Sequence, residues 1–103
     1  MRFVVYGVGA VGGPLAVRLT QHGVEVVAVA RGAHAGAIAS GGLTLETPDE
    51  TVRVKIPVVT SPADIEFRPG DVVLLCVKTQ NTVEGLEQLA PTMPEQIPVV
   101  CAQ

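Results

Sequence analysis

The 103-residue sequence has few aromatic residues, few cysteines and few charges. It contains no tryptophan, and its three aromatic residues are Phe3, Tyr6 and Phe67. Two cysteines, Cys76 and Cys101, do not make a disulfide framework, so we expect both thiols to be free. Charged residues make up 17% of the chain, with seven basic and ten acidic side chains. Because no basic patch with interleaved aromatic residues occurs, we expect no nucleic-acid binding.

The sequence also lacks a long apolar run. Glycine, arginine, histidine or proline interrupts each apolar stretch before it reaches the roughly 20 residues that span a bilayer, so we expect no membrane segment. There is no cluster of metal ligands and no nucleophile beside a base, so we predict no metal site and no catalytic residue. Hydrophobic residues make up 48% of the chain, which excludes a disordered protein. We expect a single cytoplasmic domain over residues 1–103.

What is present is an alternation of strand-like and helix-like segments. Residues 3–6 and 24–30 are apolar and rich in β-branched residues, as strands covered on both faces are. Between them, apolar residues recur at helical spacing: Val11, Leu15 and Leu19. A strand, a helix and a strand in this length form a βαβ unit. The sequence therefore predicts an α/β, Rossmann-like, doubly wound fold with a mostly parallel sheet.

The remaining segments continue this alternation and insert a β-hairpin. The predicted elements are a short helix over 34–40 ended by Gly41-Gly42, a hairpin over 43–47 and 51–55 with one exposed face, a possible continued strand over 56–60, a turn over 68–71, a buried strand over 72–77, a helix over 83–90 and a last strand over 98–103. Because a finished domain rarely stops on a strand, we expect this domain to be truncated at its C-terminal end.

A glycine motif follows the first strand and opens the first helix. Gly7 allows a tight turn, Gly9 lets the backbone approach a pyrophosphate, and Gly12 lets the helix pack close to the strand. The helix N-terminus adds unpaired N–H groups and a partial positive charge. We therefore predict a dinucleotide site over the whole motif: Gly7, Val8, Gly9, Ala10, Val11 and Gly12. The alternative is a glycine-rich turn with only a packing role.

The residues after the second strand favour NADP(H) over NAD(H). An NAD-binding domain usually places Asp or Glu there to bind the ribose 2′-hydroxyl, whereas this chain has Arg31 and no acid. A guanidinium binds a 2′-phosphate through charge-assisted hydrogen bonds, and His34 could add to the pocket weakly. The alternative is an ordinary solvated arginine.

Lys78 ends the most apolar strand, whose carboxyl end faces the ligand crevice in an open parallel sheet. It could contact a phosphate, the nicotinamide side of the cofactor or an anionic substrate. The alternative is a lysine that extends into solvent.

Three segments together resemble the N-terminal domain of the ketopantoate reductase (2-dehydropantoate 2-reductase) family: residues 1–13, 29–31 and 74–80. The resemblance covers essentially all 103 residues but only about the first third of a typical member. It implies an NADPH-dependent oxidoreductase of pantothenate biosynthesis whose full-length form reduces a small 2-oxo acid such as ketopantoate. It further implies that Gly7 to Gly12 hold the pyrophosphate, that Arg31 holds the 2′-phosphate, and that Lys78 lines the cleft.

The resemblance also implies which parts of the enzyme are missing. A family asparagine is expected one position beyond Gln103, and the catalytic lysine and a substrate-binding carboxylate belong to an absent helical C-terminal domain. In the full enzyme the nicotinamide transfers a hydride while that lysine donates a proton. We therefore expect these 103 residues to hold the cofactor without turnover.

Other functions remain open at this stage. The chain could be a non-catalytic NAD(P)-sensing regulatory module, although such modules commonly carry an acid after the second strand. It could belong to another two-domain NADP-dependent dehydrogenase, since a fold does not fix a substrate. It could also bind nothing and self-associate through an open sheet edge.

Overall fold

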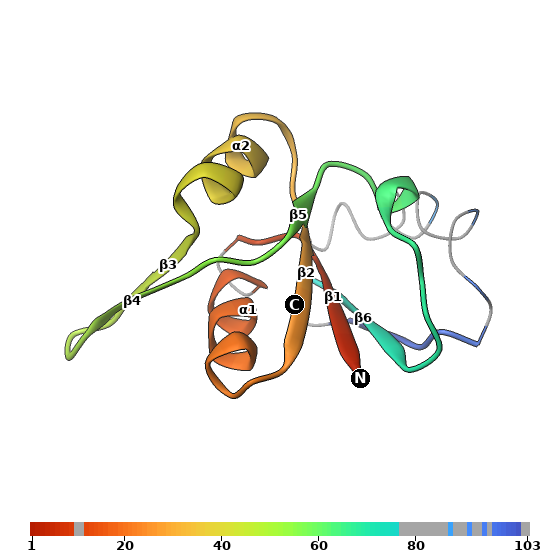
Figure 1. Cartoon of the computed structure of the whole chain (residues 1–103), viewed down its shortest axis with the longest axis horizontal. Helices are drawn as coiled ribbons and strands as arrows, with labels where there is room; N and C mark the ends of the chain where they lie inside the picture. Colours follow the sequence, from red (N-terminus) through yellow and green to blue (C-terminus); the bar gives the residue numbers. More distant parts are fainter. Residues whose placement is uncertain (10–11, 77–86, 88–90, 92–93, 95, 102–103) are drawn as a thin grey trace.

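The computed structural model describes residues 1–9, 12–76, 87, 91, 94 and 96–101 (Figure 1). Its centre is a five-stranded parallel sheet in the order β5-β2-β1-β6-β7. The strands are β1 (Arg2–Tyr6), β2 (Glu25–Val29), β5 (Val58–Val59), β6 (Asp71–Leu75) and β7 (Val99–Cys101). The strand order reverses at β1, which is the switch point of a doubly wound sheet. The predicted α/β fold is confirmed.

The two faces of the sheet build two separate cores, because side chains alternate along each strand. On one face, Val5 and Ala28 join Ala16 and Val17 of helix α1 (Gly12–Gln21). On the other face, Val4, Tyr6, Val73 and Leu75 pack together, with Val4 beside Val73 and Tyr6 beside Leu75 in register. Strand β1 is therefore covered on both sides, as its uninterrupted apolar sequence predicts.

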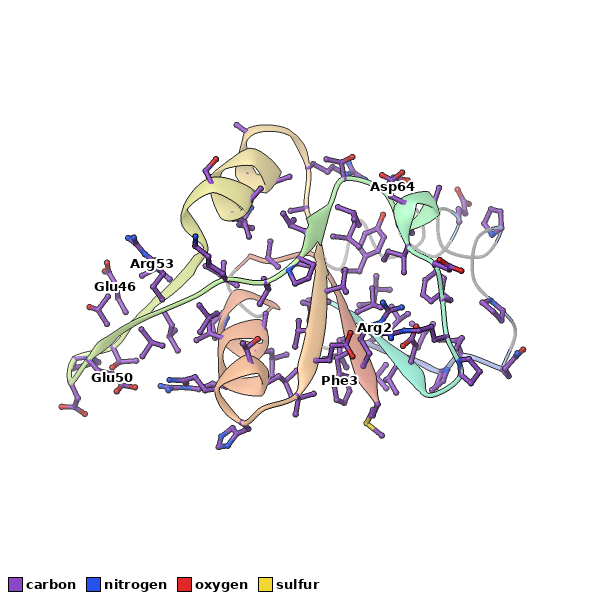
Figure 2. All side chains as sticks on the ribbon, in the orientation of Figure 1. Arg2, Phe3, Glu46, Glu50, Arg53 and Asp64 are labelled. Carbon is purple, nitrogen blue, oxygen red and sulfur yellow. The ribbon has the colours of Figure 1, made fainter. Side chains whose placement is uncertain are left out.

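The hairpin of β3 (Leu43–Glu46) and β4 (Thr51–Val54) forms a small antiparallel sheet of its own. It contacts α1, and in Figure 1 it projects from the main sheet beyond that helix. Its apolar residues Leu43, Leu45, Val52 and Val54 pack on the core cluster that α1 shares. Figure 2 shows Glu46, Glu50 and Arg53 on this projecting hairpin. The predicted hairpin with one exposed face is confirmed.

Helix α1 buries a different face from the one that its leucines predict. Gly12, Gly13, Ala16 and Val17 are its buried residues, whereas Leu15 and Leu19 are half-buried at the side of the same cluster. Small residues let the helix axis approach the sheet closely, and the larger side chains must then lie beside the contact. Val11, the third residue of the predicted stripe, lies outside the described part of the chain.

Several boundaries also differ from the predicted ones. Helix α2 (Gly32–Gly41) starts two residues early, and Gly42 ends it with its N–H donated to the Ile38 carbonyl at 2.8 Å. The possible strand over 56–60 shrinks to β5 at the sheet edge, and a short 3₁₀ turn (Pro62–Asp64) follows it. Asp71, expected in a turn, begins β6 instead. The helix predicted over 83–90 lies outside the described residues, apart from Glu87.

Candidate cofactor site

The carboxyl ends of β1, β2 and β6 meet at Gly7. Gly7 follows β1 with φ 96°, a backbone conformation that favours glycine. Its N–H donates to the Val29 carbonyl at the end of β2, at 3.0 Å. The N–H of Cys76 donates to the Tyr6 carbonyl at 2.8 Å. The turn after β1 is therefore fixed to both neighbouring strands at the switch point, where open α/β sheets bind ligands.

Gly12 and Gly9 differ in the space around them. A Cβ on Gly12 would lie 1.8 Å from the Gly7 oxygen and 3.0 Å from the Cβ of Cys76, so only glycine fits there. A Cβ on Gly9 would meet nothing within 4 Å, and Gly9 is exposed. The close helix–strand approach predicted for Gly12 is thus present, and Gly9 offers an open stretch of backbone.

The first turn of α1 suits an anion. It carries no acidic residue, so no carboxylate offsets the partial positive charge at this helix end. Val8 is 6% exposed and belongs to the core, so only its backbone is left for a ligand. Ala10 and Val11, also predicted for the site, lie outside the described residues. The assignment of this loop to a dinucleotide phosphate group stays a prediction.

Arg31 lies at the same edge of the sheet, two residues after Val29, the last residue of β2. It is the N-cap residue of α2 in extended conformation (φ −110°, ψ 148°), and its carbonyl accepts the Ala35 N–H at 3.3 Å. Arg31 and His34 are both exposed, and the first turn of α2 carries no acid. The structure therefore brings Arg31 to the carboxyl edge that holds the glycine turn. Lys78 falls outside the described residues.

Cys76 directly follows β6 and Cys101 ends the neighbouring strand β7, and the two cysteines lie on different faces of the sheet. Both are free; Cys76 is buried and Cys101 is exposed. Cys76 belongs to the core on the α1 face, whereas Cys101 pairs in register with Leu75 of the opposite core. Among the residues that the structure describes, no group of three or more His, Cys, Asp or Glu gathers as a metal site would require.

Sequence reasoning missed an ion pair at the amino ends of the strands. Arg2 and Asp71 are the first residues of β1 and β6 and face each other in register. Arg2 Nη2 lies 2.6 Å from Asp71 Oδ2, and Arg2 Nε donates to Oδ1 at 3.1 Å. The Arg68 N–H donates to Oδ2 at 2.8 Å. No local signal could have found this pair, because it depends on which strands become neighbours.

The carboxyl group of Asp71 stays ionised although it is 2% exposed. Burial by itself would raise its pKa, but the hydrogen bonds from Arg2 and the Arg68 N–H, with the charges of both arginines, outweigh burial and lower the pKa below its ordinary value. This pair lies at the end of the sheet opposite the glycine turn, so it belongs to the framework and not to the cofactor site.

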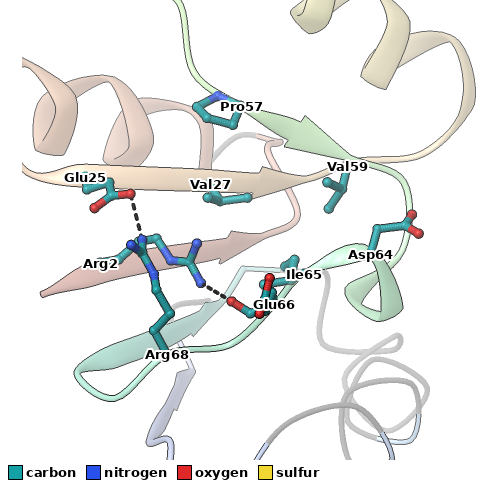
Figure 3. A pocket seen from close by; sticks show the side chains of 9 residues that line it. All are labelled: Arg2, Glu25, Val27, Pro57, Val59, Asp64, Ile65, Glu66 and Arg68. Atoms are coloured by element: carbon teal, nitrogen blue, oxygen red, sulfur yellow. Dashed lines mark hydrogen bonds and ion pairs between the residues drawn. The ribbon is translucent and has the colours of Figure 1, made fainter.

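An open pocket of about 540 Å³ lies near that same end, between the β2–β5 edge and residues 64–68 (Figure 3). Val27, Val59 and Ile65 supply its apolar lining. Its two arginines are engaged: Arg68 pairs with Glu25 at 2.7 Å, and Arg2 donates to the Glu66 carbonyl at 3.0 Å. The pocket is not lined by the glycine turn or by Arg31, so it is separate from the candidate cofactor site.

The chain matches a known protein family along almost its whole length. The model of the family described as ketopantoate reductase PanE/ApbA matches residues 3–103. The chain belongs to this family. A curated 2-dehydropantoate 2-reductase of Mesorhizobium japonicum is 35% identical over 105 residues, and one of Aquifex aeolicus is 28% identical over 103 residues. Each alignment covers 100% of this chain and 31% of the relative, so the chain spans about a third of their length.

Solved structures of a family member and of a D-mandelate dehydrogenase share the fold of this domain. A PanE/ApbA family ketopantoate reductase from Ralstonia eutropha is 32% identical with a TM-score of 0.79, over 96% of this chain and 33% of that one. A D-mandelate dehydrogenase solved with NADH and anilino(oxo)acetate is 25% identical with a TM-score of 0.84, over 98% and 32%. The chain thus corresponds to the N-terminal NAD(P)-binding domain of ketopantoate reductase-like dehydrogenases.

None of the helices in the described part of the chain is long and apolar enough to cross a membrane.

Proposed function

We propose that this chain binds NADPH as the cofactor-binding part of a 2-dehydropantoate 2-reductase whose full-length form reduces a small 2-oxo acid such as ketopantoate. The observation that carries the cofactor choice is the position of Arg31. It follows β2 at the edge where the glycine turn lies, and the residues directly after that strand, 30–34, include no acid. A carboxylate there would repel a 2′-phosphate, whereas a guanidinium binds it.

Each part of the edge has a distinct task in this proposal. The N–H groups in the first turn of α1 receive the pyrophosphate, which approaches across Gly9, where no Cβ intervenes. Arg31 binds the 2′-phosphate, and Lys78 lines the cleft toward the substrate. The bound nicotinamide supplies the hydride. The residues on this chain bind and orient the cofactor, and we expect no turnover of a 2-oxo acid with NADPH by the 103 residues alone, measured as NADPH consumption.

The D-mandelate dehydrogenase is the reason to test the cofactor first. Its structure contains NADH together with anilino(oxo)acetate, a 2-oxo acid derivative. The acid supports the proposed substrate class, but the cofactor is the one without a 2′-phosphate. The fold therefore accommodates NADH in that protein, and Arg31 is the residue on this chain that favours NADPH in our proposal.

The decisive experiment is a calorimetric titration with NADPH and with NADH, for the unsubstituted chain and for Arg31→Asp. We expect tighter binding of NADPH, and a roughly ten- to hundredfold loss of NADPH affinity on substitution, because charge-assisted hydrogen bonds are replaced by repulsion. Arg53→Asp is the matched control, since Arg53 is an exposed arginine on the hairpin. Equal affinities for both cofactors in the unsubstituted chain would contradict the assignment of Arg31.

The same titration bears on the other functions. Membership of a reductase family favours an enzyme part over a non-catalytic NAD(P)-sensing module, and a preference for NADH would favour the module or a different dehydrogenase. Self-association through β7, where Val100 is 49% exposed, is the outcome to examine by light scattering if neither cofactor binds. A cytoplasmic location stays a prediction.

A further inference from the structure

Cys76 lies directly under the start of helix α1. Its side chain is 9% exposed and belongs to the core cluster that contains Val8 and Ala16. Its Cβ is 3.0 Å from the place where a Cβ on Gly12 would be. Its N–H is bonded to the Tyr6 carbonyl at 2.8 Å, so the backbone at this position is fixed. Residue 76 therefore forms part of the surface on which the first turn of α1 rests.

The size of this side chain matters more than its chemistry. Burial raises the pKa of the Cys76 thiol, so the group stays neutral at pH 7 and packs as a small apolar side chain. Protein interiors are close-packed, and an added methylene must displace a neighbour. The contact between Gly12 and the Gly7 carbonyl leaves the helix no room to move closer to β1. We therefore expect a larger side chain at position 76 to push the first turn of α1 away from the sheet.

We propose that Cys76 is a positioning residue: its small side chain sets where the first turn of α1 lies and so aims the helix N–H groups at the cofactor pyrophosphate. This inference rests on the proposed NADPH binding. It differs from the role of the glycine motif, because Cys76 comes from another strand and does not itself contact the cofactor. It predicts that binding of the pyrophosphate is sensitive to volume at position 76.

The chain offers a matched control for this position. Cys101 ends the neighbouring strand β7 but is exposed and aligned with the opposite face of the sheet. Cys101→Leu therefore adds the same atoms at nearly the same level of the sheet without contacting α1. Cys76→Ser supplies the conservative variant, since it keeps nearly the same volume.

The test compares two ligands, NADPH and adenosine 2′-monophosphate, by calorimetry. The second ligand carries the 2′-phosphate without a pyrophosphate, so it reports on the Arg31 side alone. For Cys76→Leu we expect NADPH affinity to fall roughly tenfold or more, because helix N–H groups that no longer point at the pyrophosphate lose charge-assisted hydrogen bonds. The affinity for adenosine 2′-monophosphate should stay unchanged. Cys76→Ser and Cys101→Leu should retain the unsubstituted affinities. If circular dichroism shows that Cys76→Leu does not fold, Cys76→Val provides a smaller increase in volume for the same comparison.

Each contrary result has its own meaning. Unchanged NADPH affinity in a folded Cys76→Leu chain would overturn the positioning role alone. An equal loss for both ligands would also overturn it, because a general distortion would not distinguish them. Failure of the unsubstituted chain to bind NADPH would overturn the proposed function, and the positioning role with it.

Discussion

Only glycine fits at position 12, because the Gly7 carbonyl oxygen occupies the place of a Cβ. At Gly9 the same atom would project into open space. The two glycines belong to one motif but serve different partners: Gly12 accommodates the protein's own backbone, and Gly9 leaves room for a ligand. This difference makes their substitutions separable.

We predict that Gly12→Ala lowers the stability of the fold, whereas Gly9→Ala weakens NADPH binding. Overpacking at Gly12 should lower the free energy of unfolding by about 2 kcal/mol. Gly9→Ala should change it by less than about 0.5 kcal/mol but weaken NADPH binding, since the methyl group stands in the path of the pyrophosphate. Urea unfolding and calorimetry measure the two quantities. Normal NADPH affinity in Gly9→Ala would place the ligand elsewhere.

At the scale of elements, local patterns predict what lies close in sequence. The apolar runs of β1, β2 and β6, the alternation of the hairpin and the glycine motif all appear where the residues indicate. The contacts that the sequence could not predict depend on strand pairing. Arg2 meets Asp71, and Cys76 meets Gly12, only because β6 lies beside β1. The spacing of Leu15 and Leu19 predicted a different buried face of α1 for a related reason, because the small residues of this helix make the contact with the sheet.

Helix α2 provides a prediction at this scale. Gly36 lies in the middle of the helix, and a Cβ there would meet nothing within 4 Å. Gly36→Ala should therefore stabilise the chain by about 0.5–1 kcal/mol through reduced backbone entropy of the unfolded state. Gly42→Ala is the contrasting variant, because Gly42 has φ 81° and its Cβ would lie 2.6 Å from the Val54 oxygen. The midpoint of thermal unfolding should rise for Gly36→Ala and fall for Gly42→Ala.

At the scale of the molecule, the sheet has two chemically different ends. The carboxyl ends of the strands carry the glycine turn and Arg31, and the amino ends carry the buried ion pair of Arg2 and Asp71. The ion pair ties the central strand to β6 and to the segment that precedes it. Its loss should therefore affect global unfolding and not cofactor selectivity.

Asp71→Asn tests this with a defined pH dependence. The pKa of folded Asp71 is lower than its ordinary value of about 3.8, so its contribution is fully present above that pH and is lost as the pH falls through the folded pKa. We expect Asp71→Asn to lower the free energy of unfolding at pH 7 by roughly 3 kcal/mol. The difference from the unsubstituted chain should shrink below about pH 4.

Glu25→Gln is the control, because the Glu25–Arg68 pair is exposed, at 59% and 51%. Such pairs contribute less than about 1 kcal/mol. Urea unfolding at pH 7 and at pH 3 to 5 measures both variants. An Asp71→Asn chain as stable as the Glu25→Gln chain would contradict a structural role for the buried pair.

The direction of β1 has a practical consequence. Met1 is 83% exposed at one end of this strand, and the glycine turn begins at the other end, about 16 Å away by the rise of a five-residue strand. A chain tethered to a solid support through its amino terminus would therefore present the edge that we propose for nucleotide binding to the solution. Oriented immobilisation of this kind suits a surface-based sensor for nicotinamide cofactors.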